Sequence, residues 1–535
     1  MKRTKPSAAD PGALTNLDAA LAAMSAAALR EVVREVLREL DDRARSRIVG
    51  SIIARAARTG TGFVPVAVSD EQVSEVLAFV KAAERVGYAD PSEVDEYLAR
   101  GSAAFLRKDY AAAHRIFDAL LPPIGAGNVD LGQREMVNEV LGADVAECAT
   151  QYVVSTYMLA PLAERAEAVY GAIDRVRCVG HFWAPLRELE RVAVEPLADL
   201  AAFLPRWRVL IASKPVRERS SDWDTEENRW LREVVRRLEG AEGLAQIART
   251  TKRAHDLRAW CASLVEAKDW HAALKAFREA AELVDDQDDA SAEFLDGAAL
   301  AAQSLERKDL PVFLESAWRA SPSMLRLRRW LGSSSSKTSL RQRIIEGLEA
   351  CPKAAARQRA LLHVLSHDFA PAAELLASAP GLGWSSGEHP GHLIFLIFAR
   401  LLRGTPGHAR SALDPMERTA LDPDELDAMP ADPEVPRLRT PSFDSLLELA
   451  GVSHISDATS RRALLAGMMG AAERRVAGVT DHERRRYYGH AAKLVATCVA
   501  CDETGEIARW ASALQAEYRR FPALRDELER ALRAP

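Results

Sequence analysis

The sequence predicts an all-α protein, an α-solenoid of antiparallel helical hairpins that ends in a further helical unit. Three observations lead to this fold class. A packing pattern of small and aromatic residues recurs at fixed spacing, helix-capping residues mark several helix starts, and the alternation of Val, Ile and Thr that is typical of strands is almost absent.

The recurring pattern places an acidic residue before an aromatic one, then Ala, then a bulky apolar residue. One copy runs from Asp109 to Phe117, a second from Asp269 to Phe277, and a weaker third from Asp368 to Leu376. In a helical hairpin the Ala lets the paired helices approach closely, and the larger side chains fill the space beside it. The pattern therefore predicts paired helices.

A degraded copy begins at Asp309, 40 residues after Asp269, with Phe313 in place of the Ala and Ala317 in place of the bulky residue. A period near 40 is closer to a degenerate helical repeat than to a strict repeat of about 34 residues. Residues 130–250 show helical patterns without a legible repeat.

The composition indicates a globular protein with enough apolar residues for several cores. Of 535 residues, 48% are hydrophobic and 28% are charged, and the net charge of -6 comes from interleaved acids and bases. Long-range attraction to nucleic acid or to an anionic membrane is therefore not expected. The six cysteines are scattered through helical patterns, which favours a reducing compartment and buried packing roles. We expect a cytoplasmic protein with no membrane partner.

Capping and breaking residues divide the chain into five predicted segments. Residues 1–62 form an N-terminal helical segment, with two or three amphipathic helices from Asn16 to Arg58. Residues 69–331 form the main array of hairpins, and residues 337–403 continue it. Residues 404–441 form a proline-rich linker, and residues 442–535 form a C-terminal helical unit that could cap the array.

Individual residues set these boundaries. Asp90 before Pro91, Ser69 before two acids, and the stretch 222–224 are expected to open helices. The apolar stripe of the N-terminal segment comprises Leu29, Val32, Val33, Val36, Leu37 and Leu40. The Ser-rich stretch 332–336 breaks the array. It superficially suggests a phosphate-binding loop, but Ser336 stands where that loop needs Gly before Lys337, so we expect a flexible connector.

The three copies of the pattern resemble the tetratricopeptide repeat. In the first copy the residues at the large and small packing positions of that repeat are Tyr97, Gly101, Phe105, Tyr110, Ala113 and Phe117. The resemblance implies a concave face that binds peptides or proteins. The residues it suggests for a partner-binding groove are Leu98, Ser102, Phe105, Arg258 and Ala262. The family's carboxylate clamp uses basic and amide residues on this face, whereas the corresponding positions here are Leu98 and Ser102 in one copy and Arg258 and Ala262 in another, so no such clamp is expected.

The end of the chain, from about Ala471 to Leu532, resembles the helical region of bacterial SWIM zinc-finger proteins. Members of that family carry a Cys-x-Cys…Cys-x-His module and are thought to be nucleic-acid or protein adaptors. This chain has neither half of the module, so the resemblance implies a helical bacterial scaffold without the zinc site.

Histidines form the best enzyme-like cluster in the sequence. His363 and His367 lie four residues apart on a predicted helix, and His389 and His392 follow soon after. Converging imidazoles with a carboxylate could hold zinc. The helix lacks the Glu of a His-Glu-x-x-His motif, so surface or capping roles are favoured.

Three other groups have a structural interpretation that we prefer. Cys498 and Cys501 lie in an apolar helical stripe with Leu494, Val495 and Val499 and are expected to pack there. Arg484 to Tyr488 is interpreted as a solvated helix face with two tyrosines turned inward, not as a nucleic-acid contact. The acidic run 285–289 lacks the spacing of a calcium loop and is expected to be a solvated turn.

The sequence therefore predicts a non-catalytic helical-repeat scaffold, without cofactor or metal, that binds a protein or peptide. Trp260, Trp270, Phe105 and Tyr110 are the aromatic residues most worth testing, although most are expected in the core. One alternative is a nucleic-acid-associated adaptor. A second is a metal-dependent enzyme that uses the cluster of His363 and His367.

Overall fold

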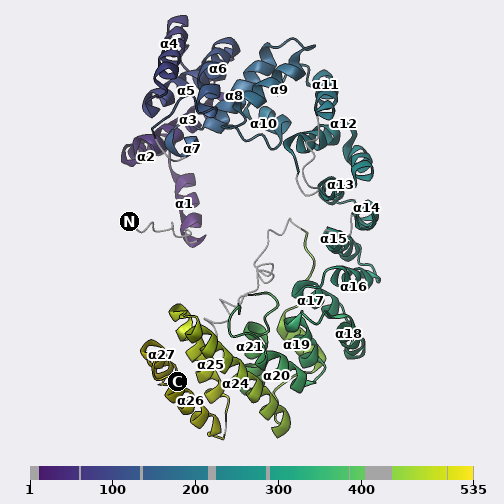
Figure 1. The fold of residues 1–535 in the computed structure, drawn as a ribbon. Coiled ribbons are helices and arrows are strands. Elements are labelled where there is room, and N and C mark those ends of the chain that lie inside the picture. Colours follow the sequence, from purple (N-terminus) through teal and green to yellow (C-terminus); the bar gives the residue numbers. More distant parts are fainter. Residues whose placement is uncertain are drawn as a thin grey trace. The chain divides into compact units, whose positions relative to one another are not determined.

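The computed structural model of the protein describes residues 11–59, 62–132, 136–214, 224–284, 290–384, 386–403, 436–502 and 504–533. Within these ranges the regular elements are helices (Figure 1), and the one β contact is an isolated bridge between Tyr88 and Asp130. The all-α prediction is confirmed.

The chain divides into two compact units, Met1–Leu244 and Ala245–Pro535. The division falls inside α12 (Glu226–Thr251), close to Gly240, whose backbone is not helical. It therefore lies within the predicted array 69–331. The five-segment division itself stays a prediction.

Unit 1 is built by packing of neighbouring helices, with α5 on α6, α6 on α4 and α8, and α8 on α9 and α10. Its helices before α12 are α1 (Pro11–Ala23), α2 (Ala26–Glu39), α3 (Asp42–Arg58), α4 (Asp70–Val86), α5 (Pro91–Leu106), α6 (Tyr110–Gly125), α7 (Val137–Val140), α8 (Val145–Leu159), α9 (Arg165–Val176), α10 (Pro185–Val192) and α11 (Leu200–Ser213).

In unit 2 each helix from α13 to α21 packs on the next along the chain, and α24 then packs on α20, α21 and α25. Its helices are α13 (Ala254–Glu266), α14 (Trp270–Leu283), α15 (Ala290–Ser304), α16 (Leu310–Ala320), α17 (Met324–Gly332), α18 (Lys337–Ala350), α19 (Ala356–Leu365), α20 (Phe369–Ala377), α21 (Gly391–Arg403), α23 (Phe443–Ala450), α24 (Ala458–Asp481), the short η2 (Arg485–Tyr487), α25 (Tyr488–Ala500), α26 (Glu506–Glu517) and α27 (Pro522–Arg533).

The predicted helix starts are found where the capping residues stand. The Asp90 carboxylate accepts a hydrogen bond from the Ser92 amide at 2.8 Å, and Pro91 begins α5. Ser69 and Gln72 form a reciprocal capping box at the start of α4. These side chains satisfy amides that have no partner within the helix, which fixes where each helix begins.

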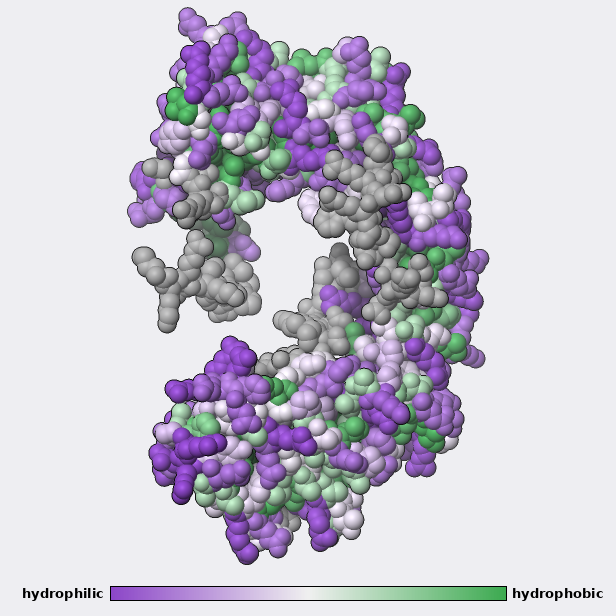
Figure 2. Space-filling view, viewed as in Figure 1, coloured by the Kyte–Doolittle hydropathy of each residue, from purple (hydrophilic) through white to green (hydrophobic). Residues whose placement is uncertain are grey.

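The N-terminal segment contains three helices, in agreement with the two or three expected. The apolar stripe of α2 is, however, not a core face, because no residue of α2 is buried and Val33 and Val36 are exposed. Elsewhere hydrophilic and hydrophobic residues are interspersed over both units on the face drawn in Figure 2.

The three clear copies of the sequence pattern share one turn. Before each acidic residue the chain has a positive φ, at Lys108 (67°), Lys268 (56°) and His367 (64°). In each copy this residue's amide bonds to the carbonyl three residues back, and the next amide bonds to the carbonyl five residues back. This is the Schellman arrangement, which satisfies the last carbonyls of one helix and reverses the chain into the next.

The degraded copy has the same turn displaced by two residues. Glu306 has the positive φ of 51°, and the Glu306 and Arg307 amides make the corresponding bonds to Gln303 and Ala302. Asp309 therefore follows the turn instead of completing it, and its carboxylate pairs with Arg307 at 2.7 Å.

The small and bulky residues of the pattern pack as expected. Ala113, Ala273 and Ala372 are fully buried. The Phe117 ring lies against Gly101, where an added Cβ would be 2.7 Å from it. Phe277 lies in the same way against Gly297 of α15. Each bulky ring thus occupies the space that a glycine leaves on a neighbouring helix.

The Ser-rich stretch separates α17 from α18, as expected. Its hydrogen bonds indicate an ordered turn and not the flexible connector predicted. Ser336 caps α18, and the Arg343 guanidinium donates to the Ser333 and Ser334 hydroxyls at 2.8 and 3.0 Å. The acidic run 285–289, most of the linker 404–441 and residues 222–223 lie outside the described residues. Among the described helices, none has the length and apolar character needed to cross a membrane.

We expect Phe117→Ala to lower the free energy of unfolding of unit 1 by about 3–5 kcal/mol, because it empties a fully buried site facing Gly101. Urea denaturation measures this change. Val209→Ala is the control, since Val209 is 70% exposed and should change stability by less than about 0.5 kcal/mol. Equal stability of the two variants would contradict the packing described.

We expect Lys268→Gly to raise the free energy of unfolding of unit 2 by about 0.5–1 kcal/mol, because Gly adopts a positive φ without the steric cost that Lys268 bears. Lys275→Gly, at an exposed position inside α14, should instead lower it by about 1 kcal/mol. Thermal melts of both variants test the sign, and destabilisation by Lys268→Gly would refute this role for the turn.

Candidate functional site

The groove residues suggested in α5 belong to the packing face of that helix. Leu98 and Phe105 have no exposed surface, so neither side chain is available to a partner. Ser102 is partly buried, and its hydroxyl lies 3.7 Å from the Cys148 sulfur. The motif positions that make the hairpin recognisable are thus used for packing within unit 1.

The groove residues suggested in α13 lie in unit 2, whereas those in α5 lie in unit 1. The Arg258 guanidinium donates to both carboxylate oxygens of Glu293 at 2.7–2.9 Å. Ala262 is exposed. The five residues are thus divided between the two units, and the groove they were suggested to form stays a prediction.

His363 and His367 have separate partners. His363 Nδ1 lies 3.4 Å from the Asp368 carboxylate, and a His367 ring nitrogen lies 3.2 Å from the Ala450 carbonyl oxygen. Burial, the largest effect, lowers the pKa of His363, and Asp368 opposes this shift. Both histidines border the turn before Asp368, which gives them structural contacts.

His389 and His392 do come together, around Trp384. Their ring centroids lie 5.2 and 5.6 Å from that of Trp384. Among the described residues, however, no group of three or more His, Cys, Asp or Glu side chains is placed to hold a metal ion. The four histidines therefore do not form the zinc site considered as an alternative.

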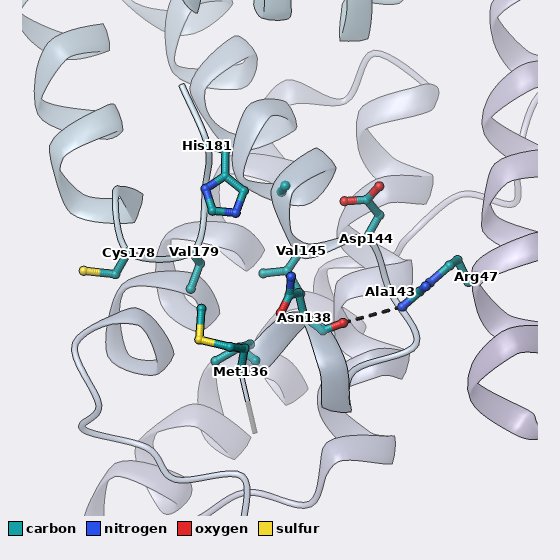
Figure 3. A pocket seen from close by; sticks show the side chains of 11 residues that line it. Arg47, Met136, Asn138, Ala143, Asp144, Val145, Cys178, Val179 and His181 are labelled. Carbon is teal, nitrogen blue, oxygen red and sulfur yellow. Dashed lines mark hydrogen bonds between the residues drawn. The ribbon is translucent and has the colours of Figure 1, made fainter. Parts of the chain in front are cut away.

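A pocket of about 480 Å³ lies in unit 1 and was not found from the sequence. It is bordered by α3, by the short helix α7, by the start of α8 and by the loop that follows α9 (Figure 3). Val145 and Val179 supply buried apolar wall, and Val137 is partly buried. Met136 is 66% exposed and adds a flexible apolar side chain.

Polar groups form the rim of this pocket. Arg47 enters from α3, with its guanidinium 3.5 Å from the Asn138 carbonyl oxygen, and His181 lies on the opposite side (Figure 3). The exposed Asp144 adds a negative charge. Cys178 borders the pocket, but its sulfur points away from the other labelled side chains. An apolar floor with a few polar groups at the edge is typical of sites that bind a ligand side chain.

Hydrogen bonds hold the pocket open from behind. The Asp95 carboxylate of α5 accepts bonds from the Gly142 and Ala143 amides at 2.7 and 2.8 Å. Arg43 of α3 donates to the Asn138 and Leu141 carbonyls at 2.8 and 3.2 Å. These bonds fix the backbone between α7 and α8, so the walls are formed before any partner arrives.

Little in the sequence could have revealed the pocket, because its walls come from residues far apart in the chain. The expectation that all six cysteines are buried was wrong for Cys178, which borders the pocket. Cys178 is exposed, whereas the other five cysteines are buried, and all six are free. Its position just after α9, outside the helical pattern, was the available signal.

The C-terminal unit tests the predicted burial of two cysteines and two tyrosines. Cys498 and Cys501 are buried as expected. Tyr488 is buried, but Tyr487 is 36% exposed, so the expectation that both tyrosines turn inward was wrong for Tyr487. Its ring contacts two guanidinium groups, with the guanidinium carbon of Arg475 at 5.1 Å and that of Arg486 at 4.6 Å from the centroid.

No protein-family model matches this sequence, and a search of curated proteins finds no relative.

We expect Asp95→Ala to lower the free energy of unfolding of unit 1 by about 1.5–3 kcal/mol, because two backbone amides lose a charged acceptor. Asp95→Asn keeps one acceptor oxygen and should lose roughly half as much. Urea denaturation of the two variants gives the comparison. If Asp95→Ala is as stable as the unmodified protein, the carboxylate does not hold the pocket wall.

Proposed function

We propose that the protein is a non-catalytic helical-repeat scaffold, similar to tetratricopeptide arrays, that binds a protein or peptide segment at the pocket of unit 1. The pocket carries this proposal. It is open to solvent and supported by Asp95 and Arg43, and its lining combines apolar and polar groups.

The repeat interpretation is supported by the common turn before Asp109, Asp269 and Asp368. A turn that recurs with the same hydrogen bonds and the same buried Ala indicates that one hairpin unit is used several times. Stacked hairpins of this kind form extended surfaces, which suit the binding of a segment of another protein.

The lining indicates what kind of segment would bind. Met136, Val137, Val145 and Val179 offer apolar contact to one anchoring side chain, while Arg47 and Asp144 place opposite charges at the rim. A short segment with an apolar anchor between polar residues fits this chemistry, because the anchor is desolvated and the flanking groups stay hydrated. Methionine favours such contacts, since its side chain adapts to the shape of the partner.

Nucleic acid is the less favoured partner. Arg484, Arg485 and Arg486 are all exposed, which is the best concentration of positive charge suggested by the sequence. Asp481 and Glu483 are exposed beside them, and Arg486 covers Tyr487. This surface offers neither an undiluted basic patch nor a free aromatic face for a base.

Peptides selected from a random library displayed on phage should bind the purified full-length protein, and Met136→Glu should weaken them at least about tenfold by placing a charge among apolar contacts. Val209→Glu is the matched control, because Val209 is equally exposed on unit 1 but does not line the pocket. Fluorescence anisotropy gives the dissociation constants.

Three outcomes separate the alternatives. Binding that Val209→Glu preserves and Met136→Glu weakens supports the proposal. If both variants bind equally well, the peptide does not use this pocket. If no peptide is selected, while labelled single-stranded RNA binds with an affinity that falls steeply with salt, the adaptor alternative replaces the scaffold.

A further inference from the structure

Unit 2 contains a buried cluster of ionisable side chains that the proposed function does not use. The histidine cluster consists of Trp384, His392, Arg475 and His490, from the segment before α21, α21 itself, α24 and α25. The His490 ring centroid lies 5.2 Å from that of Trp384 and 5.6 Å from that of His392. The Arg475 guanidinium carbon lies 5.8 Å from the Trp384 centroid.

Polar atoms in this cluster lack hydrogen-bond partners. They are Trp384 Nε1, His392 Nδ1, Arg475 Nε and both ring nitrogens of His490. The first three side chains are at most 9% exposed. Buried polar atoms normally find partners, so a cluster of unpartnered ones needs an explanation.

The neighbouring His389 is an imidazole whose two ring nitrogens both have hydrogen-bond partners. Its Nδ1 accepts a hydrogen bond from the Gly391 amide at 3.0 Å, so Nε2 carries the proton and donates to the Pro380 carbonyl at 2.8 Å. This ring is held in one neutral tautomer. His392 and His490 have no such arrangement.

The charged groups that act on His392 and His490 are cations. Arg357 and Arg475 act on His392, and Arg475 and Lys493 act on His490. The nearest carboxylate on α27 is Glu527, beside Gly489, and it pairs with Arg530 at 2.8 Å. Glu388, in the segment before α21, is exposed and lies near Gln358. Neither acid compensates a positive charge on His490.

Burial, followed by these cations, lowers the pKa of His392 to about 4 and the pKa of His490 to about 3. Both rings are therefore neutral in the closed structure at neutral pH. In an open or unfolded state their pKa would return to about 6.5. Closure is thus fully favoured above pH 6.5 and loses stability as the pH falls from 6.5 through the two lowered values.

The contact between α24 and the segment before α21, called the seam below, leaves little room for the side chains of the cluster to rearrange. The Arg475 guanidinium donates to the Gly381 carbonyl oxygen at 3.0 Å. A Cβ added at Gly381 would lie 2.0 Å from the Arg474 carbonyl oxygen, so the two backbones are in direct contact. Two imidazolium rings beside Arg475 could gain water only if these contacts separate.

We propose that the histidine cluster is an acid-sensitive latch, in which proton uptake by His392 and His490 separates Trp384 and α21 from α24 and α25. The latch belongs to unit 2 and is independent of the peptide pocket. Its function is to loosen the contact of the C-terminal helices with α21 on acidification.

Hydrogen exchange with mass spectrometry on the full-length protein, corrected for the intrinsic pH dependence of exchange, tests this latch. Between pH 7.5 and pH 5, the opening equilibrium of peptides from α21 and α25 should rise about 30-fold for each histidine that regains a pKa of about 6.5. Peptides from α14 should not change over the same range.

The variant His392→Phe/His490→Phe keeps aromatic rings in the cluster but cannot take up protons. It should abolish the pH-dependent rise in α21 and α25 while leaving protection at pH 7.5 intact. If the double variant does not fold, His490→Gln should remove about half of the rise on a logarithmic scale. An unchanged wild-type protein at pH 5, or an equal rise in wild type and variants, would overturn the latch.

Discussion

Close approach of helices at small residues is the constraint on which the structure depends. Gly101 receives the Phe117 ring, and an added Cβ at Gly467 of α24 would lie 2.8 Å from the Ala373 Cβ of α20. At such positions two helices come close together, and a large side chain of the neighbouring helix can fill the space that remains. The Schellman turns make this possible, because they reverse the chain within a few residues and bring the next helix back against the last.

The pocket of unit 1 lies where this mode of packing stops. The helix α7 has only four residues, too few to present a packing stripe, and the backbone between α7 and α8 is held by the Asp95 carboxylate and the Arg43 guanidinium. The Asp95 and Arg43 side chains hold this backbone by hydrogen bonds and do not fill the space beside it. A concave surface with apolar walls remains, which explains why this part of unit 1 offers a site.

The fold was predictable because its determinants are local. A capping residue such as Asp90, or the run from Asp109 to Phe117, contains within a few positions the information that starts a helix or pairs two helices. The same fact explains why Leu98 and Phe105 are buried: residues that make a hairpin recognisable do so because they pack. The pocket and the histidine cluster bring together residues as far apart as Arg47 with His181, and Trp384 with His490, and no local pattern signals such distant neighbours.

The tight packing and the histidine cluster are physically connected. An added Cβ at Gly478 would lie 2.9 Å from the Gly381 backbone, so α24 and the segment before α21 meet without intervening side chains. Such a seam excludes water and leaves no space for a compensating carboxylate, and the imidazoles enclosed beside it must be neutral. Direct contact between these backbones therefore stabilises unit 2 at neutral pH. The same contact is the one that protonation of His392 and His490 would weaken.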